Sequence, residues 1–262
     1  MRSLGRFRMR GLVSTGGSLI RLAPRRWWLR FGAWLLPSRC ALCDAATDDD
    51  IALCPPCRAE LPTNDPCCRR CAEPLPRAEP LCGRCLKREP AFASSFAGFR
   101  YAWPLDGLVT RFKFSGNLAA GRTLAALFAE RIRSDSVELP SLIVPVPLHL
   151  RRLRERGYDQ ALELARDVGR ELGVAVSTDL LRRTRATPAQ TGLDAKGRRR
   201  NVRDAFAIDD RALARVPGRP TIALLDDVMT TGSTVGECAT ILRSAGFGTI
   251  HAWCIARAPA RG

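Results

Sequence analysis

Histidine, aromatic residues and long apolar runs are all scarce in this chain. Its two histidines, His149 and His251, are too few for a histidine triad or a histidine-rich metal site. Aromatic residues make up only 6% of the sequence, so we expect few platforms on which nucleobases could stack. No run approaches the roughly 18 uncharged apolar residues of a membrane-spanning helix, so we do not expect an integral membrane protein.

Acidic residues are missing from the first 39 positions, which hold nine arginines, and the whole chain carries a net charge of +16. Such an excess indicates anionic partners, such as phosphates, nucleic acid or anionic lipid, without choosing among them. Residues 11–20 are only weakly apolar and lack a clear cleavage site, so we do not expect a secretory signal. The arginine-rich, acid-free composition of this segment leaves an organellar transit peptide as an alternative.

The basic arm, residues 1–36, ends in a short segment whose apolar residues have helical spacing from 27 to 35. We predict a short amphipathic helix that packs on the rest of the protein. An interfacial helix that contacts anionic lipid or nucleic acid is the alternative.

Cysteine is abundant instead, and eight of the eleven residues form four C-x-x-C pairs. The unit C-x2-C-x10-C-x2-C occurs twice, with the second copy 28 residues after the first. A disulfide framework would not explain four short pairs at one spacing. We therefore predict bound zinc in a reducing cytoplasm.

Two tight C-x-x-C turns can close one tetrahedral zinc site, and four thiolates leave no open position for catalysis. The sequential assignment gives two structural zinc ions, with an interleaved pairing left open and Cys67 as a conceivable substitute ligand. Residues 37–90 have too few large aliphatic residues to fold without metal. The predicted ligands are Cys40, Cys43, Cys54 and Cys57 for one ion, and Cys68, Cys71, Cys82 and Cys85 for the other.

From residue 92 onward, apolar segments alternate with amphipathic ones. Fully apolar strands between helices favour an α/β domain, residues 91–262, with a parallel sheet covered by helices on both faces. The predicted strands are 95–101, 142–146, 221–225 and 249–255, and the predicted helices are 121–132, 160–172 and 233–245.

An acid pair followed by a hydroxyl-rich turn separates the third of these strands from the last helix. A Gly/Ser/Thr turn at a helix N-terminus offers N–H groups and hydroxyls to a phosphate. Adjacent carboxylates can hold vicinal hydroxyls or hydrated Mg²⁺. A strand end followed by a simple helix cap is the structural alternative. The residues are Asp226, Asp227, Thr230, Thr231, Gly232, Ser233 and Thr234.

This stretch resembles the ribose-phosphate signature of type I phosphoribosyltransferases. The resemblance implies that Asp226 and Asp227 hold the ribose hydroxyls of phosphoribosyl pyrophosphate (PRPP), bound with Mg²⁺, and that the residues from Thr230 to Thr234 cradle its 5-phosphate. Purine-salvage members carry an aspartate where this chain has Thr230, which puts purine-base salvage in doubt.

Two basic segments complete the implied site. The loop at 147–152 would bind pyrophosphate through Arg151 and Arg152, unless it is only a solvated helix end. The segment 182–203 would close over PRPP as a mobile loop, with Lys196 and Arg198 neutralising the departing pyrophosphate. Nucleic-acid binding is the competing use of that segment.

All of these elements in this order resemble the competence protein F (ComF) family, over roughly residues 30–258. The family pattern Thr-x-x-Gln-x-x-Leu-x4-Arg-x-x-Asn is matched by Thr187, Gln190, Leu193, Arg198 and Asn201. The family pattern Arg-x-Arg-Gly-aromatic-x-Gln is matched by Arg154, Arg156, Gly157, Tyr158 and Gln160. The resemblance implies a double zinc ribbon at 37–90, a type I phosphoribosyltransferase fold and a link to natural transformation.

Our hypothesis from the sequence is a cytoplasmic PRPP-binding protein that transfers or senses a phosphoribosyl group, with an acceptor that the pattern does not identify. The sequence favours an enzyme, although it offers no obvious residue to act as general base. The alternative is a non-catalytic accessory protein that binds single-stranded DNA, in which the PRPP site is vestigial or regulatory. DNA-uptake proteins are implied partners, and the oligomeric state is open.

Overall fold

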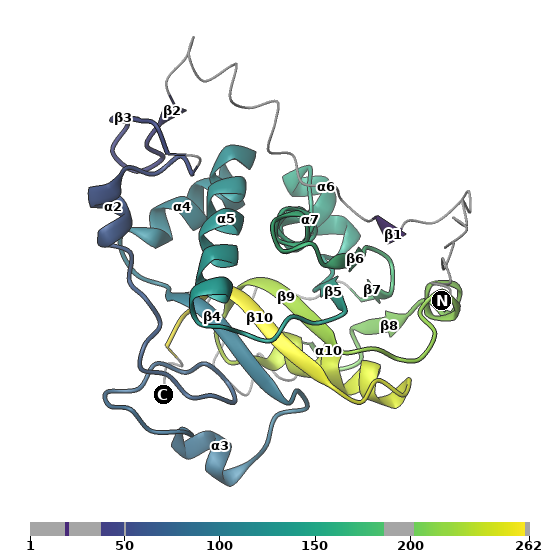
Figure 1. Cartoon of the computed structure of the whole chain (residues 1–262). Coiled ribbons are helices and arrows are strands. Elements are labelled where there is room, and N and C mark those ends of the chain that lie inside the picture. The colour runs from purple at the N-terminus through teal and green to yellow at the C-terminus, as the bar shows by residue number, and fades with distance from the viewer. Residues whose placement is uncertain (1–18, 21–37, 50, 186–201, 260–262) are drawn as a thin grey trace, which may run out of the picture.

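The computed structural model describes residues 19–20, 38–49, 51–185 and 202–259. Its centre is a six-stranded sheet in the order β1-β6-β5-β9-β10-β4, drawn in Figure 1. All neighbours are parallel except β1, which pairs antiparallel with β6. The strands are β1 (Leu19–Ile20), β4 (Ser94–Arg100), β5 (Leu142–Pro145), β6 (Ala175–Ser177), β9 (Ile222–Met229) and β10 (Ile250–Arg257).

The two longest strands, β9 and β10, lie inside the sheet and are apolar on both faces. Alternate residues of β9 enter different cores: Ile222 and Leu224 pack on one side of the sheet, and Ala223 and Leu225 on the other. Burial on both faces explains why these segments read as continuous apolar runs. The predicted α/β class with a parallel sheet is confirmed.

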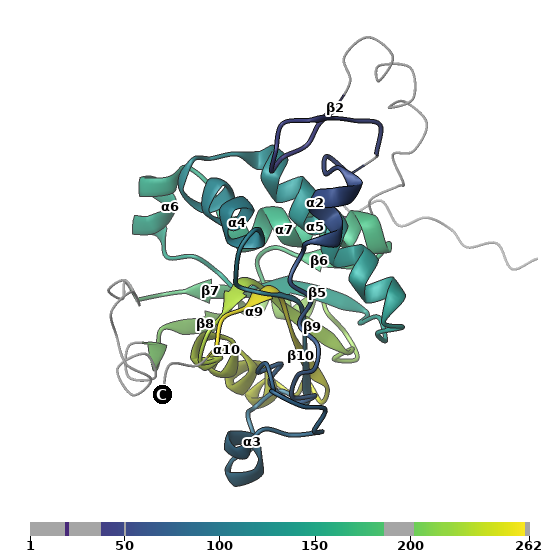
Figure 2. The same ribbon diagram turned by 90° about the vertical axis from the view of Figure 1, so that its left-hand side faces the viewer.

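Helices cover both faces of the sheet (Figure 2). One face carries α4 (Leu105–Phe114), α5 (Leu118–Ser134) and α7 (Gln160–Leu172), and the other carries α10 (Ser233–Ser244). The sequence predicted α7 with the same bounds, α5 and α10 with slightly different ones, and did not predict α4. An aromatic cluster anchors α5, because the Phe128 ring lies 5.9 Å from that of Trp253 in β10.

The two cysteine-rich segments pack on opposite faces of the sheet. Cys40, Leu53 and Cys54 of the first join the core under α4 and α5, whereas Cys68 and Cys85 of the second join the core under α10. In both views α2 (Pro55–Ala59) lies near α5 and α3 (Gly83–Lys87) lies beyond the opposite face (Figures 1 and 2). The sheet therefore separates the two predicted zinc sites.

Short elements complete the described chain, and within it no helix is both long and apolar enough to cross a bilayer. Two of these elements, β7 and β8, pair antiparallel beside α10. They are β2 (Ser38–Arg39), β3 (Ala46–Thr47), α6 (Leu150–Arg156), β7 (Leu181–Arg183), β8 (Phe206–Ile208) and α9 (Asp210–Ala214).

Gly169 allows α7 to approach the sheet closely, so Gly169→Ala is predicted to destabilise the fold. A Cβ there would lie 2.5 Å from a Val176 methyl carbon and 2.8 Å from the Val174 carbonyl oxygen. Overpacking of this kind costs about 1–3 kcal/mol. Denaturant unfolding measures the change. Gly107→Ala is the control, because a Cβ there meets nothing within 4 Å and alanine should stabilise α4 by up to about 1 kcal/mol. Equal effects of both changes would contradict this packing.

Candidate functional site

The strand order reverses between β5 and β9. From β5 the chain passes through α7 to β6 on one side, whereas β9 lies on the other side of β5 and is followed by β10 farther out. In parallel sheets, ligands bind outside the carboxyl ends of strands where the order reverses in this way. Pro145, the last residue of β5, is paired with Leu225, so β5 ends beside the acid pair.

The acid pair lies within β9 rather than after it. The sequence placed the strand end at residue 225, but β9 continues to Met229 because β10 pairs with it as far as Arg257. Burial and the neighbouring Asp227 carboxylate raise the pKa of Asp226 to about 7. Two acids held side by side in this way attract a cation.

Lys113 of α4 places one positive charge beside the acid pair. Its Nζ atom lies 2.9 Å from Oδ1 of Asp227, and both side chains are largely buried. Asp226 has no such direct ion pair within the described residues. The sequence analysis missed Lys113 because it lies more than a hundred positions before the acid pair and carries no motif.

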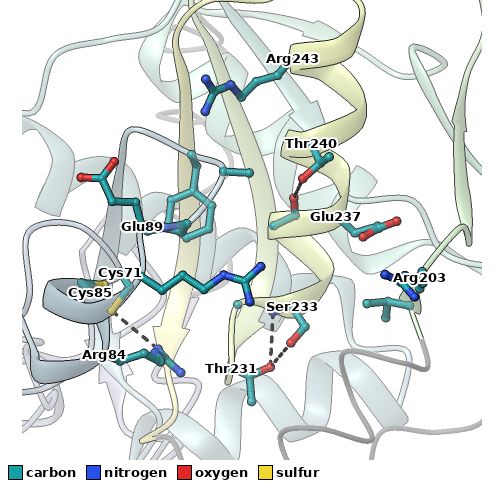
Figure 3. Close-up of a pocket in the computed structure, with 17 residues that line it drawn as sticks. Cys71, Arg84, Cys85, Glu89, Arg203, Thr231, Ser233, Glu237, Thr240 and Arg243 are labelled. Atoms are coloured by element: carbon teal, nitrogen blue, oxygen red, sulfur yellow. Dashed lines mark hydrogen bonds between the residues drawn. The ribbon is translucent and has the colours of Figure 1, made fainter.

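The hydroxyl-rich turn follows β9 and begins α10. Gly232 is its N-cap with φ of 74°, a left-handed conformation that glycine adopts without strain. The hydroxyls of Thr231 and Ser233 lie 2.7 Å apart, and the Ser233 N–H donates to the Thr231 hydroxyl over 3.3 Å (Figure 3). N–H groups at the start of a twelve-residue helix face the same place, as a phosphate requires.

Arg257, at the end of β10, connects this turn to the second cysteine-rich segment. Its Nη1 atom donates to the carbonyl of Met229 over 3.1 Å and to that of Thr230. Its Nε atom donates to the Cys71 carbonyl over 3.1 Å, and Nη2 pairs with the Glu73 carboxylate. The side chain is fully buried. Removing one partner of a buried ion pair costs about 3–5 kcal/mol, so this guanidinium fixes the turn.

The two arginines of the pyrophosphate prediction lie in different surroundings. Arg151 is exposed and its Nε atom pairs with Glu155 over 3.2 Å. Arg152 is partly buried, and burial together with the Arg156 charge lowers its pKa. Arg152 and Asp226 both influence the pKa of Arg183, which burial lowers most. The charges of Arg152 and Asp226 therefore both reach Arg183.

His149 caps α6, since its Nδ1 atom accepts the Arg151 N–H over 3.1 Å. The Asp159 carboxylate fixes the same loop by accepting the Leu148 N–H over 2.9 Å. These contacts give both residues a structural part in shaping the loop between β5 and α6.

The eight predicted cysteine ligands gather in two groups of four. Within each group all four sulfur atoms lie within 4.8 Å of one another, and the sequential assignment is the observed one. The Cys43–Cys54 and Cys71–Cys82 sulfur pairs are both 3.6 Å apart. A tetrahedral zinc ion with Zn–S bonds of 2.3 Å needs sulfur atoms roughly 3.8 Å apart, so both groups fit zinc. Cys67 belongs to neither group.

Lys196 and Arg198 lie outside the described residues, as do Thr187, Gln190, Leu193 and Asn201 of the family pattern. The predicted closing loop stays a prediction. Arg183, near the described start of this segment, lies in β7, and its guanidinium carbon lies 5.2 Å from the ring centre of Phe206 in β8.

Comparisons with known proteins agree with these features. Residues 31–86 match the family described as "Double zinc ribbon domain". The chain is 38% identical over 179 residues to "Competence protein F" of Haemophilus influenzae, covering 66% of this chain and 76% of that protein. It is 33% identical over 233 residues to "DNA utilization protein YhgH" of Escherichia coli K12, covering 87% and 93%.

A solved structure, entitled "Structure of the allosteric regulatory enzyme of purine biosynthesis", is similar at 17% identity with a TM-score of 0.34. The match covers 51% of this chain and 25% of that one. A likeness at this level supports no conclusion about function.

Asp226→Asn is predicted to stabilise the fold at alkaline pH. The pKa of Asp226 is raised in the folded chain, to about 7, above the value near 4 that an unfolded chain would have. Native stability is therefore lost progressively as the pH rises from about 4 through 7, whereas asparagine stays neutral. Thermal melts should show a small gain for the variant at pH 4 and a gain of several degrees at pH 8.

Asp227→Asn is the matched control, because it removes the ion pair with Lys113 and should not stabilise the fold. A gain in melting temperature for Asp226→Asn that is the same at pH 4 and pH 8 would contradict the raised pKa of Asp226 as its cause.

Proposed function

Because the chain belongs to the competence protein F family, we propose that it binds PRPP between β5 and β9 and transfers or senses its phosphoribosyl group. The observation that carries the proposal is the direct succession of an acid pair in β9 and a glycine-capped hydroxyl turn that begins α10.

The 5-phosphate would lie on the turn from Thr230 to Thr234. There the helix N-terminus supplies N–H donors and positive potential, and Thr231 and Ser233 supply hydroxyls. The ribose would lie toward β9, where carboxylate oxygens of Asp226 and Asp227 accept hydrogen bonds from its hydroxyls. One phosphorylated pentose satisfies both groups.

The acid pair also fits a hydrated cation. Its oxygens are the donors that Mg²⁺ prefers, and only Asp227 pairs directly with a lysine within the described residues. Magnesium that arrives with PRPP would neutralise pyrophosphate charge. We assign Arg152 and Arg183 to the pyrophosphate, because burial lowers the pKa of both and desolvation strengthens their attraction to an anion.

In a transfer step the bond between C1 of the ribose and the pyrophosphate oxygen breaks, and its electron pair leaves with pyrophosphate. A nucleophile then bonds to C1. Arg152, Arg183 and the unplaced Lys196 and Arg198 would stabilise the leaving charge. Water must be kept from C1, which is the expected task of the segment from Arg182 to Arg203.

The names of the relatives support a role in the handling of DNA. Competence protein F and DNA utilization protein YhgH are both named for such processes. We propose that the phosphoribosyl site serves DNA uptake in this chain as well, with two structural zinc ions and in the cytoplasm.

Mg²⁺-PRPP is predicted to bind the zinc-loaded protein, as measured by titration calorimetry. Asp226→Asn together with Asp227→Asn should lower the affinity at least tenfold, because the ribose hydroxyls and the cation lose their acceptors. Asp48→Asn together with Asp106→Asn is the control pair, since neither residue belongs to β9 or to the turn. Unchanged PRPP affinity in the acid-pair variant, or no binding by the native protein, would overturn the proposed function.

Loss of the second zinc ion is predicted to weaken PRPP binding more than loss of the first. Cys85→Ser removes one zinc ligand from the second cysteine group. In that group the Cys71 carbonyl accepts a hydrogen bond from Arg257, which also donates to the Thr230 carbonyl of the turn. Cys57→Ser is the matched control, because its group packs on the opposite face with α5. Zinc content and PRPP affinity should be measured together. Equal losses of affinity at equal zinc loss would contradict this connection.

A further inference from the structure

A cavity of about 670 Å³ lies between the second cysteine-rich segment and α10 (Figure 3). One wall is formed by Arg84, Cys85 and residues 88–92, and the other by Gly236, Glu237, Thr240 and Arg243 of α10. Cavities of this volume are typical of sites for small organic ligands, and a single phosphate would fill only a small part of it.

The cavity adjoins the phosphate-binding turn but not the acid pair. Thr231, Gly232 and Ser233 line it, whereas Asp226 and Asp227 do not. From Ser233 to Arg243 the lining follows α10 over about 15 Å, at 1.5 Å per residue. A ligand whose phosphate lies on the turn can therefore extend along α10, away from the place proposed for the ribose of PRPP.

Positive charge predominates on the lining. Its four arginines are Arg84, Arg88, Arg203 and Arg243, and its two acids are Glu89 and Glu237. Both acids already have partners: Glu89 pairs with Arg70 over 2.6 Å, and Glu237 accepts the Asp204 N–H over 3.0 Å.

Three of the four arginines line the cavity without a carboxylate partner in the part of the chain that the structure describes. Arg84 contacts the Cys71 sulfur and Glu73, at 3.7 Å each. Among the described residues, no ion pair engages Arg88, Arg203 or Arg243. Guanidinium groups at this density favour a ligand with more than one phosphate group.

The wall opposite α10 has an apolar part as well. Pro90 and Ala91 are half-buried and line the cavity beside the buried Phe92. A flat apolar group could cover this surface while its phosphates reach the turn and the arginines. The combination of cations, hydroxyls and an apolar wall matches the chemistry of a nucleotide.

We propose that this cavity binds a nucleoside diphosphate or triphosphate. Its phosphates lie between Ser233 and the guanidinium group of Arg88, and its base lies between Pro90 and Ala91 on one wall and Arg243 on the other. The turn is shared with the proposed PRPP site, so the nucleotide and PRPP compete. The second zinc segment thereby forms part of a regulatory site.

Titration calorimetry with ADP, inorganic pyrophosphate and adenosine, at fixed ionic strength and without PRPP, tests the proposal. ADP should bind more tightly than pyrophosphate, and adenosine weakly. Arg88→Ala together with Arg243→Ala should lower ADP affinity at least tenfold. The control pair, Arg122→Ala with Arg211→Ala, removes the same charge from exposed positions outside the cavity and should leave ADP affinity unchanged.

Three results would overturn the proposal: no ADP binding, equal loss of ADP affinity in the control pair, or pyrophosphate that binds as tightly as ADP. The acid-pair variant, Asp226→Asn with Asp227→Asn, separates it from the proposed function, because that variant should lose PRPP and keep ADP. If native protein binds ADP but not PRPP, the proposed function fails and this site stands.

Discussion

One buried guanidinium, that of Arg257, holds the candidate site together. It contacts the carbonyls of Met229 and Thr230 at the hydroxyl-rich turn, and the Cys71 carbonyl and Glu73 carboxylate of the second cysteine group. A buried charge is stable only while its partners stay in place. The turn and the second metal site are therefore one structural unit, although they lie far apart in the sequence.

The two zinc sites have different consequences for this reason. The first packs with α4 and α5, and it stabilises the face that carries Lys113, the partner of Asp227. The second packs under α10 and bounds the cavity that opens beside the turn. The first metal site thus packs on the face that supplies Lys113 to the acid pair, and the second packs on the face that carries α10 and its N-terminal turn.

The sequence predicted correctly those features that depend on residues close together in the chain. The apolar spacing of α7 gave its bounds from Gln160 to Leu172, and the repeat of C-x-x-C pairs gave both zinc ligand sets. The extension of β9 through the acid pair was missed because it depends on pairing with β10. Lys113 and Arg257 were missed as site residues for the same reason, since only the folded chain brings them to the acid pair and the turn.

The most direct test of the account is a crystal structure of the zinc-loaded protein with Mg²⁺ and PRPP. The account predicts the 5-phosphate within hydrogen-bond distance of the N–H groups of Gly232 and Ser233, and the ribose hydroxyls on the carboxylates of Asp226 and Asp227. Arg257 should keep its contacts to Thr230 and Cys71. A pentose bound elsewhere, or a turn that leaves Arg257 when the phosphate binds, would contradict it.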